Sequence, residues 1–313
     1  MIVRSGKRYD PGVDLDGNPL LVNRATGEVL QGRYVAVYPG DKIASPDQQE
    51  ANRQYIENLK KAIGRRTASR DLGKYFFIAG GQRFSDIKPQ SATRLIYLQT
   101  FADYSTHQGN RLKMNSKTNM KFDDLKKVLG LQRDAVKEFW DDVSPKYLIE
   151  DKDGLLINSD IFVKGTIYKQ QNESFYRAYC RGVRKLYEAT PKRKHGQLGY
   201  LFQLLPFINV EFNVLCFNPS ETDIDRIEFM NLDEFCELIR YDKSKRDRLL
   251  EIFKGLTFDV ADKDGTHRER FVSITGDGLT KGEHRLYVNP RVLYSGSDYK
   301  QVLILGGLSK GKT

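Results

Sequence analysis

The chain contains two similar segments that lie 110 residues apart, and this internal repeat limits the folds that it can adopt. Met120–Leu131 and Met230–Tyr241 carry apolar residues at matching positions. The acidic pair Asp123–Asp124 of the first segment corresponds to Asp233–Glu234 of the second. Because similarity at a fixed spacing is the mark of a duplicated structural unit, the sequence predicts two copies of one small fold.

The two copies remain similar beyond these segments. Each continues with a second helix candidate (residues 132–142 and 242–254), an Asp-Lys-Asp-Gly sequence (151–154 and 262–265) and a strand candidate (157–165 and 288–296). Upstream, Leu95–Gln99 partly matches Leu198–Phe202. The second copy carries about twenty extra residues between Gly265 and Val288. Several matches in the same order favour duplication over chance.

The order of elements in the first copy predicts a helix-turn-helix followed by a β-hairpin, which is a winged helix. Residues 120–129 would form the short first helix, with Gly130 at the sharp turn. Residues 132–142 would form the second helix, the one that enters the major groove of DNA. Residues 147–150 are expected to pair with 155–158, because Asp-Gly between two apolar runs is a strong hairpin signal.

In the second copy, either residues 257–260 or residues 270–274 would pair with 284–288. We therefore expect an α+β chain, mostly α, with two tandem winged-helix domains and a small N-terminal β-rich arm. The expected boundaries are residues 1–70 for the arm and its helix, 71–170 and 171–305 for the two domains, and 306–313 for a basic tail.

Several shorter elements are also predicted. The arm contains β-like pieces and a helix that Pro46 can begin, and it is followed by a polar loop, a basic helix and a strand-like run near the end. These are strands at 20–22, 28–30 and 33–38, a helix at 46–66, a loop at 110–117, a helix at 175–189 and a strand at 302–305.

Both candidate recognition helices have an apolar face and a polar face. Ala135, Val136, Phe139 and Trp140 would anchor the first helix, and Leu249, Leu250 and Phe253 the second. The polar faces then supply candidate DNA-binding residues, Gln132, Arg133 and Lys137 in the first copy and Lys243, Ser244, Lys245 and Arg248 in the second. The alternative interpretation is an ordinary solvated helix face, since Asp134, Glu138 and Asp247 dilute the positive charge.

The hairpins and the segments between helices supply further candidate phosphate contacts. Basic residues predicted to bind DNA are Lys152 in the first hairpin, Arg268, Arg270 and Arg285 in the second, and Lys192, Arg193 and Lys194 between the copies. Other basic clusters include Arg181, Arg184 and Lys185. Such contacts carry no sequence information of their own, and solvated surface is the alternative for each of them.

Composition agrees with a polyanionic partner. Lys and Arg exceed Asp and Glu by 10 in the 313 residues, which favours nucleic acid first and an anionic membrane surface second. The three cysteines, Cys180, Cys216 and Cys236, are odd in number and lack metal-ligand spacing, so we expect reduced thiols in a cytoplasmic protein. No apolar signal core or membrane-spanning run is apparent, and no membrane partner is expected.

No catalytic, cofactor or metal site is expected, and the chain is not predicted to be an enzyme. Gly306–Thr313 matches a phosphate-loop pattern, but such a loop must open a helix and the sequence stops at Thr313. The four histidines form neither an H-x-H pair nor an H-E-x-x-H motif. Nucleotide-dependent catalysis remains the least favoured hypothesis.

Two stretches resemble plasmid and phage replication initiators of the RepL type, which are winged-helix proteins. Val288–Leu305 has the Asn-Pro pair, glycine, Asp and Lys that precede an apolar strand in those proteins, and Ala25–Val29 is similar to their early Thr-Gly-Glu turn. The layout from about Lys74 to Gly165 is also similar to winged helices of other plasmid and phage initiators. The resemblance implies binding to an origin of replication, without a catalytic set or cofactor.

These observations lead to three hypotheses. The first is a sequence-specific binder of double-stranded DNA that marks or opens an origin, and the second is a transcription regulator with the same contacts at a promoter. The third is a protein–protein module that binds replication or transcription machinery. A homodimer is compatible with each of them.

Overall fold

The computed structural model describes residues 9–13, 19–23, 25–31, 46–80, 84–104, 109–165, 175–262, 265–275 and 285–308. The chain divides into two compact units, residues 1–59 and 60–313. It is a mixed α+β protein with several small antiparallel sheets. Within the described ranges, no helix combines the length and apolar character that a membrane span requires.

The first unit contains a three-stranded antiparallel sheet. Its strands are β1 (Tyr9–Val13), β2 (Pro19–Asn23) and β3 (Val29–Gln31), in that spatial order. The turn between β2 and β3 places Gly27 at a φ of +69°, a value that glycine adopts without strain. The predicted strands at 20–22 and 28–30 are therefore confirmed, whereas the one predicted at 33–38 lies outside the described residues.

Helix α1 (Pro46–Leu72) begins in the first unit and ends in the second. It confirms the helix predicted at 46–66 and continues beyond it. Ala68 and Leu72 are buried in the last turns, so packing in the second unit stabilises the added length.

The second unit holds both copies of the repeat. The first copy consists of β4 (Tyr75–Ala79), α2 (Pro89–Gln99), β5 (Asn110–Arg111), α3 (Asp124–Leu129), α4 (Arg133–Val143), β6 (Leu148–Asp151), β7 (Gly154–Ile157) and β8 (Phe162–Val163). The second consists of β9 (Phe175–Tyr179), α5 (Cys180–Ala189), α6 (His195–Phe202), α7 (Leu232–Leu238), α8 (Arg246–Gly255), β10 (Thr257–Asp262), β11 (Gly265–Arg270), β12 (Val272–Thr275) and β13 (Arg285–Val288), and α9 (Tyr299–Leu305) follows. Short 3₁₀ turns are η1 (Lys192–Lys194), η2 (Leu205–Phe207), η3 (Ile224–Arg226) and η4 (Lys243–Lys245).

Backbone hydrogen bonds repeat from one copy to the other at the start of the matched segments. The Met120 N–H donates to the Leu112 carbonyl over 2.9 Å, and the Met230 N–H donates to the Leu215 carbonyl over 3.1 Å. Each of those leucines in turn donates to the hairpin of its own copy, at Leu155 and at Leu286. The two methionines thus occupy equivalent positions, as the sequence repeat predicts.

Two buried asparagines are also equivalent. The side-chain amide of Asn110 donates to the Phe162 carbonyl over 2.7 Å, and that of Asn213 donates to the Leu293 carbonyl over 2.6 Å. In both copies the asparagine fastens the segment before the two helices to the segment that follows the hairpin. A buried amide needs such partners because an unsatisfied polar group is costly.

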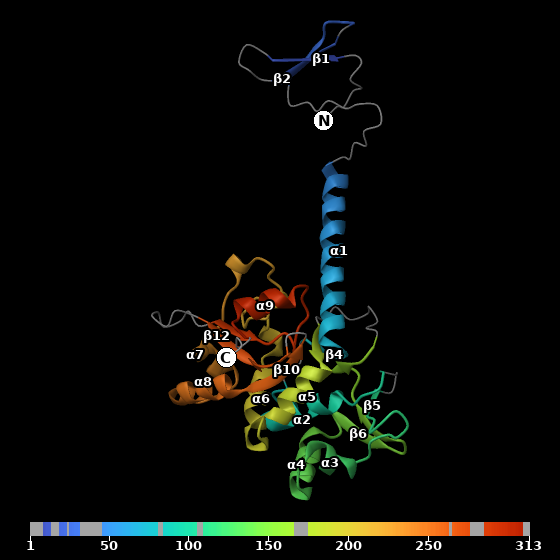
Figure 1. The fold of residues 1–313 in the computed structure, drawn as a ribbon, viewed down its shortest axis with the longest axis vertical. Coiled ribbons are helices and arrows are strands. Elements are labelled where there is room, and N and C mark those ends of the chain that lie inside the picture. Colours follow the sequence, from blue (N-terminus) through green and yellow to red (C-terminus); the bar gives the residue numbers. More distant parts are fainter. Residues whose placement is uncertain are drawn as a thin grey trace. The chain divides into compact units, whose positions relative to one another are not determined.

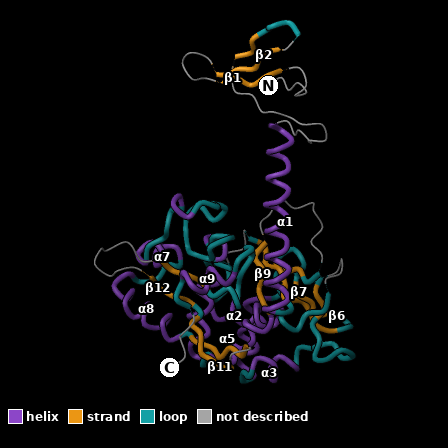
Figure 2. Tube along the Cα trace, turned by 45° about the horizontal axis from the view of Figure 1, so that its top comes forward, coloured by secondary structure: helices purple, strands orange, loops and turns teal. Residues whose placement is uncertain are grey.

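The two hairpins of the repeat are β6–β7 and β12–β13, at opposite sides of the unit in Figure 2. The first confirms the predicted pairing across Asp153-Gly154. In the second, Val272 lies opposite Val288, so the alternative with residues 270–274 is the one adopted. Residues 257–260 belong instead to a separate hairpin, β10–β11. Asp262 and Gly265, which begin and end the second Asp-Lys-Asp-Gly sequence, pair in that added hairpin, so its equivalence with residues 151–154 was wrong.

A half-turn relates the central strands of the two copies. Strands β4 and β9 pair antiparallel, with Phe77 opposite Arg177. An equivalent hydrogen bond forms at the outer edge of each of these strands. The Ala79 N–H donates to the Ile161 carbonyl over 3.0 Å, and the Tyr179 N–H donates to the Val292 carbonyl over 2.9 Å. Each copy therefore adds its own last strand to the outer edge of its own first strand.

Helices α2 and α6 lie side by side in the interior of this unit (Figure 1). Every residue of α2 from Ser91 to Gln99 is buried. The Thr93 hydroxyl donates to the His195 carbonyl over 2.8 Å, and a β-carbon at Gly199 would lie 1.8 Å from the Pro89 carbonyl oxygen. The two copies thus share one core, in which the backbones of α2 and α6 approach more closely at Gly199 than any residue with a side chain would allow.

Three predicted elements were wrong. Residues 110–117 were expected to be a loop, but Asn110–Arg111 form β5, since the Asn110 side chain is needed inside. Residues 175–189 were expected to be one helix, but the first five form β9, whose aromatic residues suit a sheet. The run 302–305 was expected to be a strand, but it belongs to α9, which Asp298 caps.

The packed part of the chain extends to Leu308. This side chain is fully buried, and its carbonyl accepts a hydrogen bond from the Arg270 N–H over 3.0 Å. The start of the predicted tail at residue 306 is therefore part of the fold, whereas residues 309–313 lie outside the described residues. A helix also precedes the phosphate-loop pattern, in place of the strand that such loops follow.

Candidate nucleic-acid interface

Helix α4 presents the predicted polar face to solvent. Gly130 ends α3 in the left-handed conformation, with a φ of +62°, and Gln132 lies at the N-cap of α4. Val136 and Phe139 are buried, whereas Arg133 and Lys137 are exposed one turn apart. The amphipathic pattern predicted for residues 132–142 is thus confirmed in the structure, with α4 at the edge of the unit (Figure 1).

The charges on α4 differ from those on α8. Among the described residues, neither Arg133 nor Lys137 is held in an ion pair. Two of the four carboxylates of the same helix contact Lys88, since Glu138 lies 3.7 Å from its ammonium and Asp142 accepts its N–H over 2.9 Å. The two α4 cations therefore remain available to an anion.

The cations before α8 are largely paired. Lys243 pairs with Glu237, and Lys245 lies 3.0 Å from Asp242. The Ser244 hydroxyl also donates to Asp242, over 2.7 Å, so η4 is a self-contained turn ahead of the helix. Arg248 is exposed on α8 and has no ion pair within the described ranges. Helix α8 and the turn before it consequently offer less free positive charge than α4.

The Lys192–Lys194 cluster lies close to α4. These residues form η1, ahead of α6, with Lys192 and Arg193 exposed and Lys194 half-buried. A β-carbon at Gly130 would lie 2.9 Å from the Lys192 ammonium nitrogen. The structure therefore brings this predicted cluster beside the turn that precedes Arg133, although the two are far apart in the sequence.

Lys152 is exposed at the tip of the β6–β7 hairpin, beside a fixed ion pair. Arg111 reaches Asp151 with both terminal nitrogens, at 2.6 and 2.7 Å. This two-point contact holds β5 to the hairpin and neutralises Asp151, so that Lys152 and Asp153 are the charges presented at the tip.

We expect Asp151 to titrate well below an ordinary aspartate. The hydrogen bonds from Arg111 lower its pKa to about 2. An unperturbed aspartate has a pKa of about 3.9. The stability that the Arg111–Asp151 pair gives the folded protein is therefore present above that pH and is lost as the pH falls towards 2. Carboxyl-carbon NMR would give the midpoint, and Arg111→Gln should return it to about 3.9. Equal midpoints in both proteins would contradict the assignment.

The predicted basic residues of the second hairpin region have separate partners. Arg268 pairs across the β10–β11 hairpin with Asp259 over 3.0 Å, and Arg270 is half-buried. Arg285 is exposed on β13, and its guanidinium lies 4.1 Å from the centre of the Phe229 ring. These residues are not gathered into one site by any contact among the described residues.

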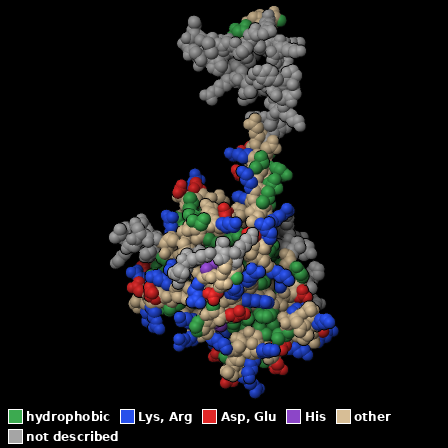
Figure 3. Space-filling view, viewed as in Figure 1, with side chains coloured by type: hydrophobic (Ala, Val, Ile, Leu, Met, Phe, Trp, Pro, Cys, Tyr) green, Lys and Arg blue, Asp and Glu red, His purple; other side chains and the backbone are tan. Residues whose placement is uncertain are grey.

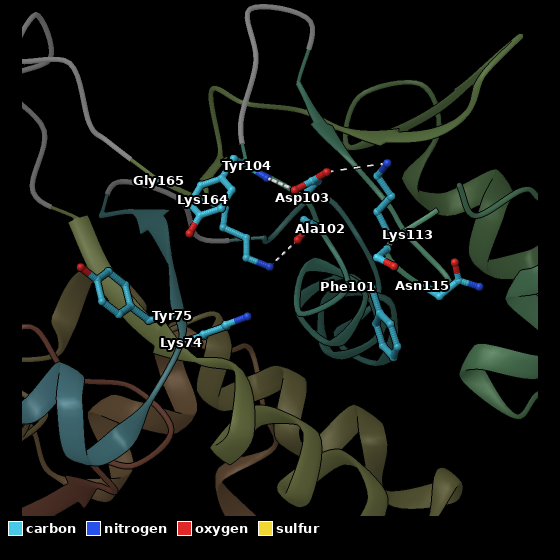
Figure 4. Close-up of a pocket in the computed structure, with 11 residues that line it drawn as sticks. Lys74, Tyr75, Phe101, Ala102, Asp103, Tyr104, Lys113, Asn115, Lys164 and Gly165 are labelled. Carbon is cyan, nitrogen blue, oxygen red and sulfur yellow. Dashed lines mark hydrogen bonds and ion pairs between the residues drawn. The ribbon is translucent and has the colours of Figure 1, made fainter. Parts of the chain in front are cut away.

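A cationic cavity that the sequence did not predict lies at the end of α2 (Figure 4). Its volume is about 540 Å³, and the amino groups of Lys74 and Lys164 point into the same space. Lys164 donates to the Ala102 carbonyl, and burial lowers the pKa of its ammonium group. Lys113 also lines the cavity, 3.7 Å from Asp103. No local pattern joins residues 74, 113 and 164, because only the fold brings them together.

The cysteines and the possible metal ligands can be located within the described residues. All three cysteines are free, with Cys216 and Cys236 buried and Cys180 half-buried. Across the described ranges, no three His, Cys, Asp or Glu side chains are arranged to hold a metal ion.

Comparison of the chain with protein-family models, with curated proteins and with solved structures found no match.

Proposed function

We propose that the protein binds double-stranded DNA through two winged helices, with α4 as the principal recognition helix. The observation that carries the proposal is the order α2–β5–α3–α4–β6–β7, in which α4 exposes Arg133 and Lys137 without carboxylate partners. The strand order β5-β7-β6 supports it, because a winged helix packs its hairpin beside the strand that precedes its two helices.

Each part of the first copy has a role in this proposal. The N-terminal half of α4 would enter the major groove, where Arg133 and Lys137 can reach guanine edges or phosphates. Lys152 at the hairpin tip and Lys192 beside Gly130 would hold phosphates on either side. In the second copy, α8 would occupy a neighbouring groove segment, with Arg248 as its unpaired cation.

We further propose that the bound sequence is an origin of replication. The resemblance of Val288–Leu305 and Ala25–Val29 to RepL-type initiators supports this role. Binding at a promoter requires the same contacts, so the position of the selected DNA site separates the two: direct repeats beside an origin favour initiation.

We expect the double variant Arg133→Ala with Lys137→Ala to bind its DNA site at least about 30-fold more weakly, since a good base contact contributes about 1–3 kcal/mol. The site is first obtained by selection from a random duplex library, and affinities are then measured by fluorescence anisotropy. The matched control is Arg226→Ala with Lys60→Ala, which also removes two exposed cations, from η3 and α1, outside both helix pairs.

The control should bind DNA within about twofold of the unaltered protein, because a surface cation that contacts no phosphate contributes little to the affinity. Equal losses in both variants would mean that only net charge matters. If selection enriches no motif and the remaining binding falls steeply with salt, the specific-binding proposal fails and a protein partner becomes the better hypothesis.

A further inference from the structure

A second basic cavity lies away from α4, and it is larger than the one at the end of α2. Its volume is about 820 Å³, and it is bounded by the last turn of α1 together with α5, β10 and α9. Five basic side chains from four separate segments line it: Arg70, Arg181, Lys185, Arg291 and Lys300. In Figure 3 blue side chains gather on this face, around the base of α1 and over α5 and β10.

Little negative charge opposes these cations. Asp71 is the one carboxylate among the described lining residues; it accepts a hydrogen bond from the Tyr299 hydroxyl over 2.9 Å and pairs with Arg70 at 3.3 Å, which leaves four cations. Arg291 uses its Nε to bind the buried Glu269 at 2.9 and 3.0 Å, which leaves its terminal nitrogens for the cavity. Arg181 and Lys300 are exposed and form no ion pair within the described part of the chain.

The cavity is rigid where α5 meets the segment after β13. A β-carbon at Gly182 would lie 2.0 Å from the Arg291 carbonyl oxygen, so the two backbones are in direct contact. Phe258 and Val260, both buried, supply an apolar floor. The backbones that carry Arg181 and Arg291 are consequently held at fixed positions around a concave surface, which lowers the entropy lost on binding an anion.

We propose that this cavity binds the phosphate backbone of single-stranded DNA; the inference rests on the proposed function in DNA binding and adds a second site to it. A duplex is wide and stiff and can touch only the rim of a concave surface. A single strand is narrow and flexible enough to lay its phosphates against recessed cations such as Arg291, which is only 20% exposed. A protein that opens DNA at its site would hold one separated strand here.

The test compares two charge reversals of equal size. Arg181→Glu with Lys300→Glu alters the cavity, and Arg226→Glu with Lys60→Glu alters exposed cations on η3 and α1, outside the cavity and outside both helix pairs. Fluorescence anisotropy with a labelled oligothymidylate and with the selected duplex is measured at several salt concentrations. Thermal melting of each variant verifies that both remain folded.

We expect the cavity variant to bind the oligothymidylate at least tenfold more weakly than the control variant. Its slope of log affinity against log salt should fall by about 1.4, because single strands contribute about 0.7 per phosphate contact. Affinity for the duplex should stay within about twofold of the control. Equal binding of the single strand by both variants would overturn the inference, as would stronger binding of an oligouridylate RNA than of the DNA.

The two proposals fail separately. If the α4 variant loses only the duplex and the cavity variant loses only the oligothymidylate, both sites exist and are distinct. If no duplex motif is selected but the cavity variant alone loses the single strand, the α4 proposal fails and the cavity inference stands.

Discussion

Replacing Gly199 with alanine is expected to lower the free energy of unfolding by about 3 kcal/mol, at the upper end of the usual cost of overpacking a core. A β-carbon there would lie 1.8 Å from the Pro89 carbonyl oxygen and 2.2 Å from its carbonyl carbon. Both are backbone atoms at the start of α2, so no side chain can rotate away. The two helices would have to separate, and they join the two copies of the repeat. Chemical denaturation gives the value directly.

The matched control is Gly196→Ala on the same helix. A β-carbon at Gly196 would have its nearest neighbour, the Gln90 side-chain oxygen, at 3.6 Å, which is ordinary contact. Alanine also favours a helix over glycine by up to about 1 kcal/mol, so this variant should be neutral or more stable. Similar losses in the two variants would show that α2 and α6 do not approach as closely as described.

Glu269→Ala is expected to cost about 3 kcal/mol of unfolding free energy, because removing one partner of a buried ion pair leaves the other uncompensated. The Glu269 side chain is fully buried and accepts hydrogen bonds from Arg291, from the Asn289 amide over 2.9 Å and from the His267 ring over 2.9 Å. The value lies at the low end for such pairs because Arg291 is 20% exposed. Denaturant titration at neutral pH measures it.

Glu269→Gln provides the comparison. Glutamine keeps the shape and one acceptor oxygen for Arg291 but removes the charge, so its loss should be clearly smaller than that of alanine. If glutamine is as destabilising as alanine, the charge rather than the hydrogen-bond network holds β11 to the segment after β13. If neither variant is destabilised, the network contributes nothing to stability.

The sequence predicted the parts of the fold whose pattern is local. The faces of α4 follow from the spacing of Val136 and Phe139, and the β6–β7 hairpin follows from Asp153-Gly154. The repeat located both helix pairs, because apolar spacing survives where individual residues change. The exposed positions of Arg133 and Lys137 could therefore be predicted before any coordinates were known.

What the sequence missed depends on contacts between distant segments. Asn110 resembles a loop residue by composition, and only the Phe162 carbonyl explains why it is buried in a strand. The second Asp-Lys-Asp-Gly motif was misleading, since a turn signal specifies a hairpin but not the sheet to which it belongs. The cavity at Arg181 and Lys300 draws on segments more than a hundred residues apart, and ion pairs such as Lys245 with Asp242 decide which cations are free.

The half-turn that relates β4 to β9 gives one polypeptide the arrangement that two identical subunits adopt in a C2 assembly. Because the halves are covalently joined, their association does not weaken on dilution, as that of separate subunits does. A mutation can also alter one half and leave the other unchanged, whereas in identical subunits the same mutation appears in both. The free cations of α4 and the paired cations before α8 differ in this way, and in the proposed binding of DNA they would suit a target whose two halves are not alike.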